Sequence, residues 1–336
     1  MDEVIRKVQL ASLILYCVIF VVGILGNGLV IYVTGFRMKR TVNSVWFLNL
    51  ALADFLFTAF LIFTIISLSN HHEWHFGYLM CKLNSLVTAI NMFASIFLLT
   101  AISLDRCLSI WVVVWAQNKR TVRKAQFISA FIWLTALICS TPYATFRDLG
   151  KHGNKTYCGY STSTTQERIQ ILRIFRFVMG FVIPFLVIFV SYVAIGVRAG
   201  RLQRTRKGRP CRIILSIILA FFICWLPFHI LQFIETKTDL RYIVRIAGSL
   251  TVSLAFMNSC LNPILYVFMC DEFQKKLKQS ICLVFESALA EDHLSFTSRS
   301  LSSHFSRISR KSDSTAPLER KDTATSSVFP ESKVGN

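Results

Sequence analysis

Residues 258–266 read NSCLNPILY and lie near the end of a long apolar run. A proline within a helix removes one backbone hydrogen bond, and nearby polar side chains can satisfy the freed carbonyl groups inside a membrane. Asn258, Ser259 and Asn262 stand where they can do this for Pro263. The stretch therefore predicts a kinked membrane helix with a polar face that points into the protein.

A second polar position lies upstream, at Asp54 in the apolar sequence NLALADFLF of residues 49–57. A carboxylate in the middle of a membrane span is unfavourable and indicates a functional position. We expect the helices that carry Asp54 and Pro263 to pack together, so that their polar groups meet away from lipid.

The composition is that of a membrane protein. Of the 336 residues 54% are hydrophobic and only 16% are charged, and the mean hydropathy is +0.52. These values are too apolar for a soluble domain of this size. The formal charge of +19 does not indicate nucleic-acid binding, because the basic residues gather in short segments between the apolar runs and in the tail.

Seven apolar spans have about the 20 residues that a bilayer requires. Because their number is odd, the two termini lie on opposite sides of the membrane. The connections after the first, third and fifth spans are rich in Lys and Arg, so these loops and the C-terminus are expected in the cytoplasm and the N-terminus outside. The spans lie near residues 10–34, 43–68, 82–111, 125–145, 171–197, 211–234 and 242–269.

The chain ends differ from the spans. Residues 1–9 are polar and predict a short extracellular N-terminus before the membrane domain of residues 10–269. Apolar side chains at helical spacing among lysines predict an amphipathic helix on the inner membrane surface over residues 270–284. Cys282 beside it is a candidate for palmitoylation, and an unmodified interfacial cysteine is the equal alternative. Residues 285–336 predict a disordered cytoplasmic tail rich in Ser and Thr.

The outer loops carry two signals of an oxidising, glycosylating compartment. Asn154-Lys155-Thr156 is a glycosylation acceptor, although such triplets are common by chance. Cys81 opens the third span and Cys158 lies in the loop that holds Asn154. A disulfide persists on that side of the membrane, so we predict one between Cys81 and Cys158.

These spans resemble the rhodopsin-like G-protein-coupled receptors, over about residues 11–284. Each span contains a motif of that family. Any one motif could occur by chance, whereas all of them in the same order support the resemblance. The motifs are GNGLV with Asn27, NLALAD with Asp54, Asp105-Arg106-Cys107 after Cys81, Trp133, Pro184 with Tyr192, the sequence CWLP at 224–227, and Asn262-Pro263 through Tyr266.

Within the family the chain is similar to the chemoattractant branch of formyl-peptide, anaphylatoxin and chemerin receptors. The similarity lies in WHFG at 74–77, SLDRCLSI at 103–110, VWAQNKRTVRKA at 114–125 and RFVMGFVIP at 176–184. The inner-loop sequence at 114–125 looks most like the chemerin-receptor group.

The resemblance implies an all-α seven-helix receptor of the plasma membrane for an extracellular peptide or protein chemoattractant, with a chemerin-like ligand among the candidates. It implies coupling to an inhibitory-class heterotrimeric G protein, then phosphorylation by receptor kinases and arrestin recruitment. Three alternatives stay open: a decoy receptor that does not signal, a receptor for an anionic lipid mediator, and, with least support, a transporter or channel. Nothing supports catalysis, because the sequence shows no nucleophile with a base and no phosphate loop.

A sodium ion is the one cofactor to consider. Asn91 and Ser95 are four positions apart and share a helix face. The resemblance places that face beside Asp54, Asn258 and Asn262, whose oxygen atoms suit a sodium ion that offsets the burial of the carboxylate. A water-filled polar network without an ion is the alternative.

The resemblance also implies a signalling set. Asp105 is the resting partner of Arg106, which binds the G protein after release, and an arginine that extends to the membrane interface is the alternative. The segment at 206–209 has no acid to hold Arg106 a second time, which predicts some basal activity. The other implied members are Tyr192 and Tyr266 around Arg106, and Pro184, Ile96 and Phe221 as a relay that could equally be core packing.

Ligand recognition centres on two arginines of the fifth span. Arg173 and Arg176 are three positions apart and can face one direction. The resemblance places Arg176 where related receptors hold an anionic group, and a guanidinium can bind a carboxylate through two hydrogen bonds. Outward-pointing arginines, or pairs with Glu235 or Asp239, are the alternatives. The other predicted pocket residues are Phe93, Phe97, Trp225, His229 and Gln232.

Overall fold

The computed structural model describes residues 2–202, 208–234, 241–269 and residue 275, and it is mainly helical. Some side chains within the helices, including that of Tyr266, lie outside this description. The helical segments are α1 Asp2–Tyr32 with the π-helical turn η1 Val33–Arg37, α2 Val42–Ser69, α3 Gly77–Trp111, α4 Val113–Lys119, α5 Val122–Thr145, the run α6 Gln166–Phe177, η2 Val178–Val182 and α7 Ile183–Leu202, α8 Gly208–Ile234, and α9 Arg241–Met269.

The long helices form the predicted seven-helix bundle. Within the described ranges, six helical segments are long and apolar enough to cross a membrane, ending with the one in α8. The seventh, α9, carries the NSCLNPILY stretch and packs against α1, α2 and α8. The expectation that the helices of Asp54 and Pro263 pack together is thus confirmed.

Helix α3 is the centre of the bundle. It contacts α2, α5, α7 and α8, and 61% of its most apolar window is buried, compared with 22% to 39% in the other five spans. The outer helices instead expose large apolar side chains such as Val18 of α1 and Phe131 of α5. Apolar side chains on the outside suit a protein surrounded by lipid.

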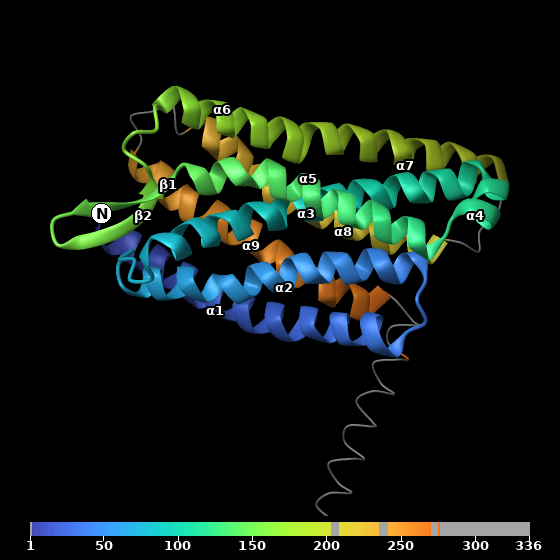
Figure 1. The fold of residues 1–336 in the computed structure, drawn as a ribbon, viewed down its shortest axis with the longest axis horizontal. Coiled ribbons are helices and arrows are strands. Elements are labelled where there is room, and N and C mark those ends of the chain that lie inside the picture. Colours follow the sequence, from blue (N-terminus) through green and yellow to red (C-terminus); the bar gives the residue numbers. More distant parts are fainter. Residues whose placement is uncertain (1, 203–207, 235–240, 270–274, 276–336) are drawn as a thin grey trace, which may run out of the picture. The chain divides into compact units, whose positions relative to one another are not determined.

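A β-hairpin covers one end of the bundle. Its strands are β1 Arg147–His152 and β2 Lys155–Tyr160, which pair antiparallel with Leu149 opposite Cys158. Gly153 in the turn has φ +60°, a backbone conformation that glycine adopts readily. The predicted disulfide is confirmed, because Cys158 of β2 is bonded to Cys81 of α3 with 5.6 Å between their Cα atoms. Figure 1 shows the hairpin and the start of α1 at one end, and α4 at the other.

Three details differ from the sequence expectations. Helix α1 begins at Asp2, so the polar N-terminal residues extend the first span instead of preceding it. The hairpin and the short helix α4 both lie in connections for which we predicted no regular structure. The predicted amphipathic helix at 270–284, apart from residue 275, and the tail at 285–336 lie outside the described residues.

Candidate functional site

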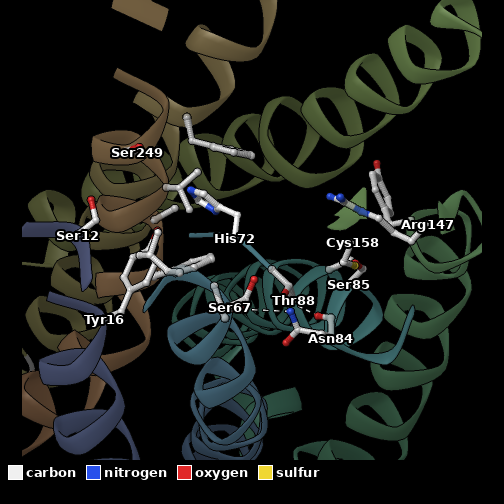
Figure 2. Close-up of a pocket in the computed structure, with 18 of the residues that line it drawn as sticks. Ser12, Tyr16, Ser67, His72, Asn84, Ser85, Thr88, Arg147, Cys158 and Ser249 are labelled. Atoms are coloured by element: carbon white, nitrogen blue, oxygen red, sulfur yellow. Dashed lines mark hydrogen bonds between the residues drawn. The ribbon is translucent and has the colours of Figure 1, made fainter. Parts of the chain in front are cut away.

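A cavity of about 380 Å³ lies at the hairpin end of the bundle. Helices α1, α2 and α3 contribute mainly uncharged polar residues to it and α9 mainly apolar ones, whereas α5, α6 and the hairpin contribute arginines and tyrosines. Its volume is in the range of small-ligand sites. Figure 2 shows side chains from these elements converging on the cavity, among them Ser12, Tyr16, Ser67, His72, Asn84, Thr88 and Arg147.

Arg176 is a partly buried cation of the cavity wall. It lies near the end of α6, where its Nη2 donates to Gln232 Oε1 at 3.1 Å and its guanidinium lies 4.7 Å from the ring centre of Phe228. Its Nε is buried without a hydrogen-bond partner in the described part of the chain, and none of the described carboxylates is within ion-pair distance. Glu235 and Asp239, the alternative partners, lie outside the described residues.

A second arginine, Arg147, also lines the cavity and was not predicted from the sequence. Its guanidinium lies 4.6 Å from the ring centre of Tyr160, which stands opposite it in the hairpin register. Among the residues that the structure describes, the lining includes two arginines and no Asp or Glu. The cavity therefore favours an anionic ligand group over a cationic one.

Most of the other residues that we predicted for the pocket are not part of the cavity lining. Trp225 does line the cavity, but Phe93 and His229 are 0% and 1% exposed and pack against other aromatic rings. The neighbouring Met92 faces the cavity instead of Phe93, because each step along a helix turns the side chain by about 100°. The residues that are not part of the lining are Phe93, Phe97, Arg173, His229 and Gln232, although Gln232 holds Arg176.

The predicted ion cluster lies deeper, where three helices meet around Asp54. Its Oδ1 accepts a hydrogen bond from Asn91 Nδ2 at 2.8 Å, and its Oδ2 accepts one from Asn262 Nδ2 at 2.7 Å. Ser259 Oγ donates to Asn91 Oδ1 at 3.4 Å. Each of these side chains is at least 97% buried, as are the predicted Ser95 and Asn258.

The cluster holds oxygen atoms that could serve as ligands of a small cation. Ser95 Oγ and Asn262 Oδ1 are buried, and neither has a hydrogen-bond partner among the described residues. Ser95 stands one helical turn from Asn91, which binds Asp54. Unsatisfied buried oxygens near a carboxylate fit a sodium ion, whose presence remains a prediction.

At the opposite end of α3, Asp105 and Arg106 belong to a larger polar cluster than the sequence suggested. Asp105 accepts two hydrogen bonds from Arg120 Nε, at 2.8 and 3.1 Å, and one from Arg120 Nη2 at 2.8 Å. Arg120 Nη2 also donates to Asn43 Oδ1 at 2.8 Å, and Arg106 donates to the same oxygen. Arg120, in the connection between α4 and α5, therefore binds Asp105, the partner that we expected for Arg106, and shares the acceptor Asn43 with Arg106.

The relay residues lie between the two ends. Ile96 and Phe221 are fully buried, and the Phe221 ring stacks on Trp225 at 5.8 Å between ring centres. Pro184 is buried in α7 and Tyr192 packs against the core. The Asn154 acceptor is exposed next to the hairpin turn, and Cys282 lies outside the described residues.

Comparisons with known proteins agree with this geometry. The family described as 7 transmembrane receptor (rhodopsin family) matches residues 26–266. The C3a anaphylatoxin chemotactic receptor of Danio rerio is 40% identical over 290 residues, which cover 85% of this chain and 79% of the relative. Chemerin-like receptor 1 of Sus scrofa is 40% identical over 324 residues, 88% of each chain. N-formyl peptide receptor 2 of Homo sapiens is 40% identical over 303 residues, 84% of this chain and 86% of the relative.

Proposed function

The chain belongs to the rhodopsin family of seven-transmembrane receptors, and from this premise we propose that it binds a chemoattractant peptide through a free C-terminal carboxylate at Arg176. The chain is a multi-pass membrane protein and a G-protein-coupled receptor of the chemoattractant type. The peptide, its carboxylate and the residue that holds it are the proposal.

Arg176 carries the proposal. The described lining of its cavity has no acidic residue, and its buried Nε has no hydrogen-bond partner in the same part of the chain. A buried, unpaired cation is unfavourable until an anion binds it. A carboxylate can accept two parallel hydrogen bonds from a guanidinium, and Arg147 adds a second positive charge on the cavity wall.

The signalling part of the proposal concerns the opposite end of α3. The receptor lies in the plasma membrane with its N-terminus outside, and it activates a heterotrimeric G protein of the inhibitory class through Arg106. Receptor kinases then modify the tail and arrestin docks. The oxidising side that a disulfide requires supports an extracellular position for the Cys81–Cys158 hairpin.

A sodium ion completes the proposal. Asp54, with Asn91, Ser95, Asn258 and Asn262 around it, would hold the ion and so offset the cost of burying a carboxylate. The unpartnered Ser95 Oγ and Asn262 Oδ1 support this assignment.

The test is activation of an inhibitory-class G protein in cells that express the full chain. Free-acid C-terminal peptides of chemerin and of C3a, and a formylated peptide, are added while surface expression is followed through an N-terminal tag. We expect at least one free-acid peptide to activate nucleotide exchange. Peptide binding at the cell surface without exchange would identify a decoy receptor instead, and absence of binding would contradict the proposed ligand class.

A further inference from the structure

The part of the cavity wall formed by α2 and α3 carries hydroxyl and amide groups. Thr64 of α2 and Asn84, Ser85 and Thr88 of α3 line it, and Figure 2 shows the last three side by side below His72. None of the described lining residues is acidic, so these groups meet a ligand as neutral hydrogen-bonding partners.

The hydroxyl hydrogens of Ser85 and Thr88 already make hydrogen bonds within the protein. Ser85 Oγ donates to Cys81 O at 3.1 Å, and Thr88 Oγ1 donates to Asn84 O at 2.8 Å. Both bonds run back to the helix's own backbone, one turn earlier. A hydroxyl has one hydrogen and two acceptor lone pairs, so Ser85 and Thr88 present acceptors to the cavity.

The neighbouring amide reinforces this polarity. Asn84 Nδ2 donates to Thr64 Oγ1 at 3.2 Å, which directs an amide hydrogen at α2 and leaves Asn84 Oδ1 as an acceptor. The arginines on the hairpin and α6 present only donors. One cavity therefore offers neutral acceptors at Ser85, Thr88 and Asn84 Oδ1, and a pair of cationic donors on another part of its wall.

Such a cavity suits a ligand that carries a carboxylate and N–H donors together. A peptide C-terminus has both, because each residue other than proline supplies one backbone N–H. A fatty acid has the carboxylate but no N–H group. Arg176 alone would bind the carboxylate of a peptide or of a fatty acid equally well. The acceptor groups of the α2 and α3 wall favour the peptide, because only the peptide has N–H groups.

We infer that Ser85 and Thr88 form a specificity subsite, which binds N–H groups of a peptide whose C-terminal carboxylate lies at Arg176. The inference rests on the proposed function and adds the residues that distinguish a peptide from an anionic lipid. Ser85 and Thr88 line the cavity at the hairpin end of α3, and neither takes part in the Asp105–Arg120 contacts at the other end of that helix.

The experiment combines receptor variants with N-methylated peptides in the G-protein activation assay. Thr88→Val keeps the shape of the side chain and removes its oxygen, and Ser85→Ala is the independent second variant. The probes are the free-acid chemerin and C3a peptides, analogues with each backbone N–H in turn replaced by N–CH₃, and a C18 fatty acid. Thr135→Val is the matched control, because Thr135 Oγ1 makes the same back-bond, to Phe131 O at 2.9 Å, on the exposed face of α5.

We expect Thr88→Val and Ser85→Ala each to lower the potency of the active peptide by about three- to tenfold, and Thr135→Val to leave it unchanged. One N-methylated analogue should lose a similar factor of potency on the wild type. On the variant that lacks the oxygen bound by that N–H, N-methylation should cause no further loss of potency. Such non-additive losses identify a direct contact.

Two results would overturn the inference in distinguishable ways. In the first, peptides activate the wild type, but for every analogue the potency lost through N-methylation adds in full to the potency lost in the receptor variant. The proposed subsite is then wrong, and the proposed function stands. If no peptide acts, both are wrong, and activation by the fatty acid would then identify a lipid receptor.

Discussion

Asp54 is a carboxylate held inside a membrane protein by neutral partners from two other helices. Both of its oxygens accept amide hydrogens, from Asn91 of α3 and Asn262 of α9, and the side chain has no exposed surface. Desolvating a charge costs several kcal/mol, which hydrogen bonds to neutral groups offset only in part. Because the partners lie on α3 and α9, an ion bound here stabilises one relative position of these helices.

A sodium site predicts a stability that depends on the cation. Sodium at ten times its dissociation constant should stabilise the purified receptor by about 1.4 kcal/mol. The measurement is thermal unfolding in sodium chloride and in N-methylglucamine chloride at equal ionic strength. Asp54→Asn, which is nearly isosteric and uncharged, should abolish the difference, whereas an equal sodium effect in that variant would place the ion elsewhere.

Helices α1 and α2 approach each other where Gly23 faces Thr58. A Cβ atom on Gly23 would lie only 2.4 Å from Thr58 Cγ2, so the two helices could not keep their present distance. Small residues permit such close approach in membranes, where van der Waals packing holds helices together. This contact lies one turn from Asp54, because Thr58 Oγ1 donates to Asp54 O at 2.8 Å.

We expect Gly23→Ala to destabilise the bundle by about 1–3 kcal/mol through overpacking. Thr58→Ser removes the clashing Cγ2 but keeps the hydroxyl, so the double variant should recover part of the loss. Gly28→Ala is the control, since its nearest atom would lie at an ordinary 3.5 Å. Thermal unfolding of the four proteins checks this, and equal losses for Gly23→Ala and Gly28→Ala would contradict it.

The long helices were predictable from the sequence because membrane spans are set by apolar length alone. The disulfide was predictable because the order of the spans puts Cys81 and Cys158 at the same end of the bundle. The hairpin was not predictable from the sequence, because its residues KHGNKT at 151–156 lack the apolar alternation of a half-buried strand. Its turn contains Gly153 at a positive φ, and the disulfide joins its second strand to α3.

The cavity was predictable only in part. Arg176 and Trp225 were found by family resemblance, whereas Phe93 and His229 were placed on the wall although they are buried behind it. The direction in which a helical side chain points depends on the rotation of the helix against its neighbours, which a single sequence does not contain. Arg147 was missed because the hairpin, and not a span, brings it to the cavity.

The bundle holds a cavity at its hairpin end and a cluster with two arginines at the opposite end of α3. Trp225 lines the cavity and stacks on Phe221, and the Asp54 cluster joins α2 to α3 and α9. At the opposite end Asp105 is the carboxylate bound by Arg120, and Asn43 accepts from both Arg106 and Arg120. A change in one cluster can thus reach the other through the packed helix α3.

The inner cluster should limit basal signalling. Asp105→Asn removes the negative charge that Arg120 binds and that lies next to Arg106 in the chain, so we expect ligand-free nucleotide exchange to rise several-fold. A charged hydrogen bond contributes about 1.5–3 kcal/mol, enough for such a change. Asp148→Asn, on the hairpin, serves as the control. Unchanged exchange in Asp105→Asn membranes would show that this carboxylate does not restrain the receptor.

The most direct test of the carboxylate site pairs ligand chemistry with Arg176. The active peptide is measured as free acid and as amide on the wild type, on Arg176→Ala and on Arg173→Ala, a nearby arginine that is not part of the cavity lining. We predict that the free acid is more potent than the amide by about 10- to 150-fold on the wild type and on Arg173→Ala, and that this ratio falls to near one on Arg176→Ala at equal surface expression. A ratio that persists on Arg176→Ala would contradict the account, because the carboxylate would then bind elsewhere.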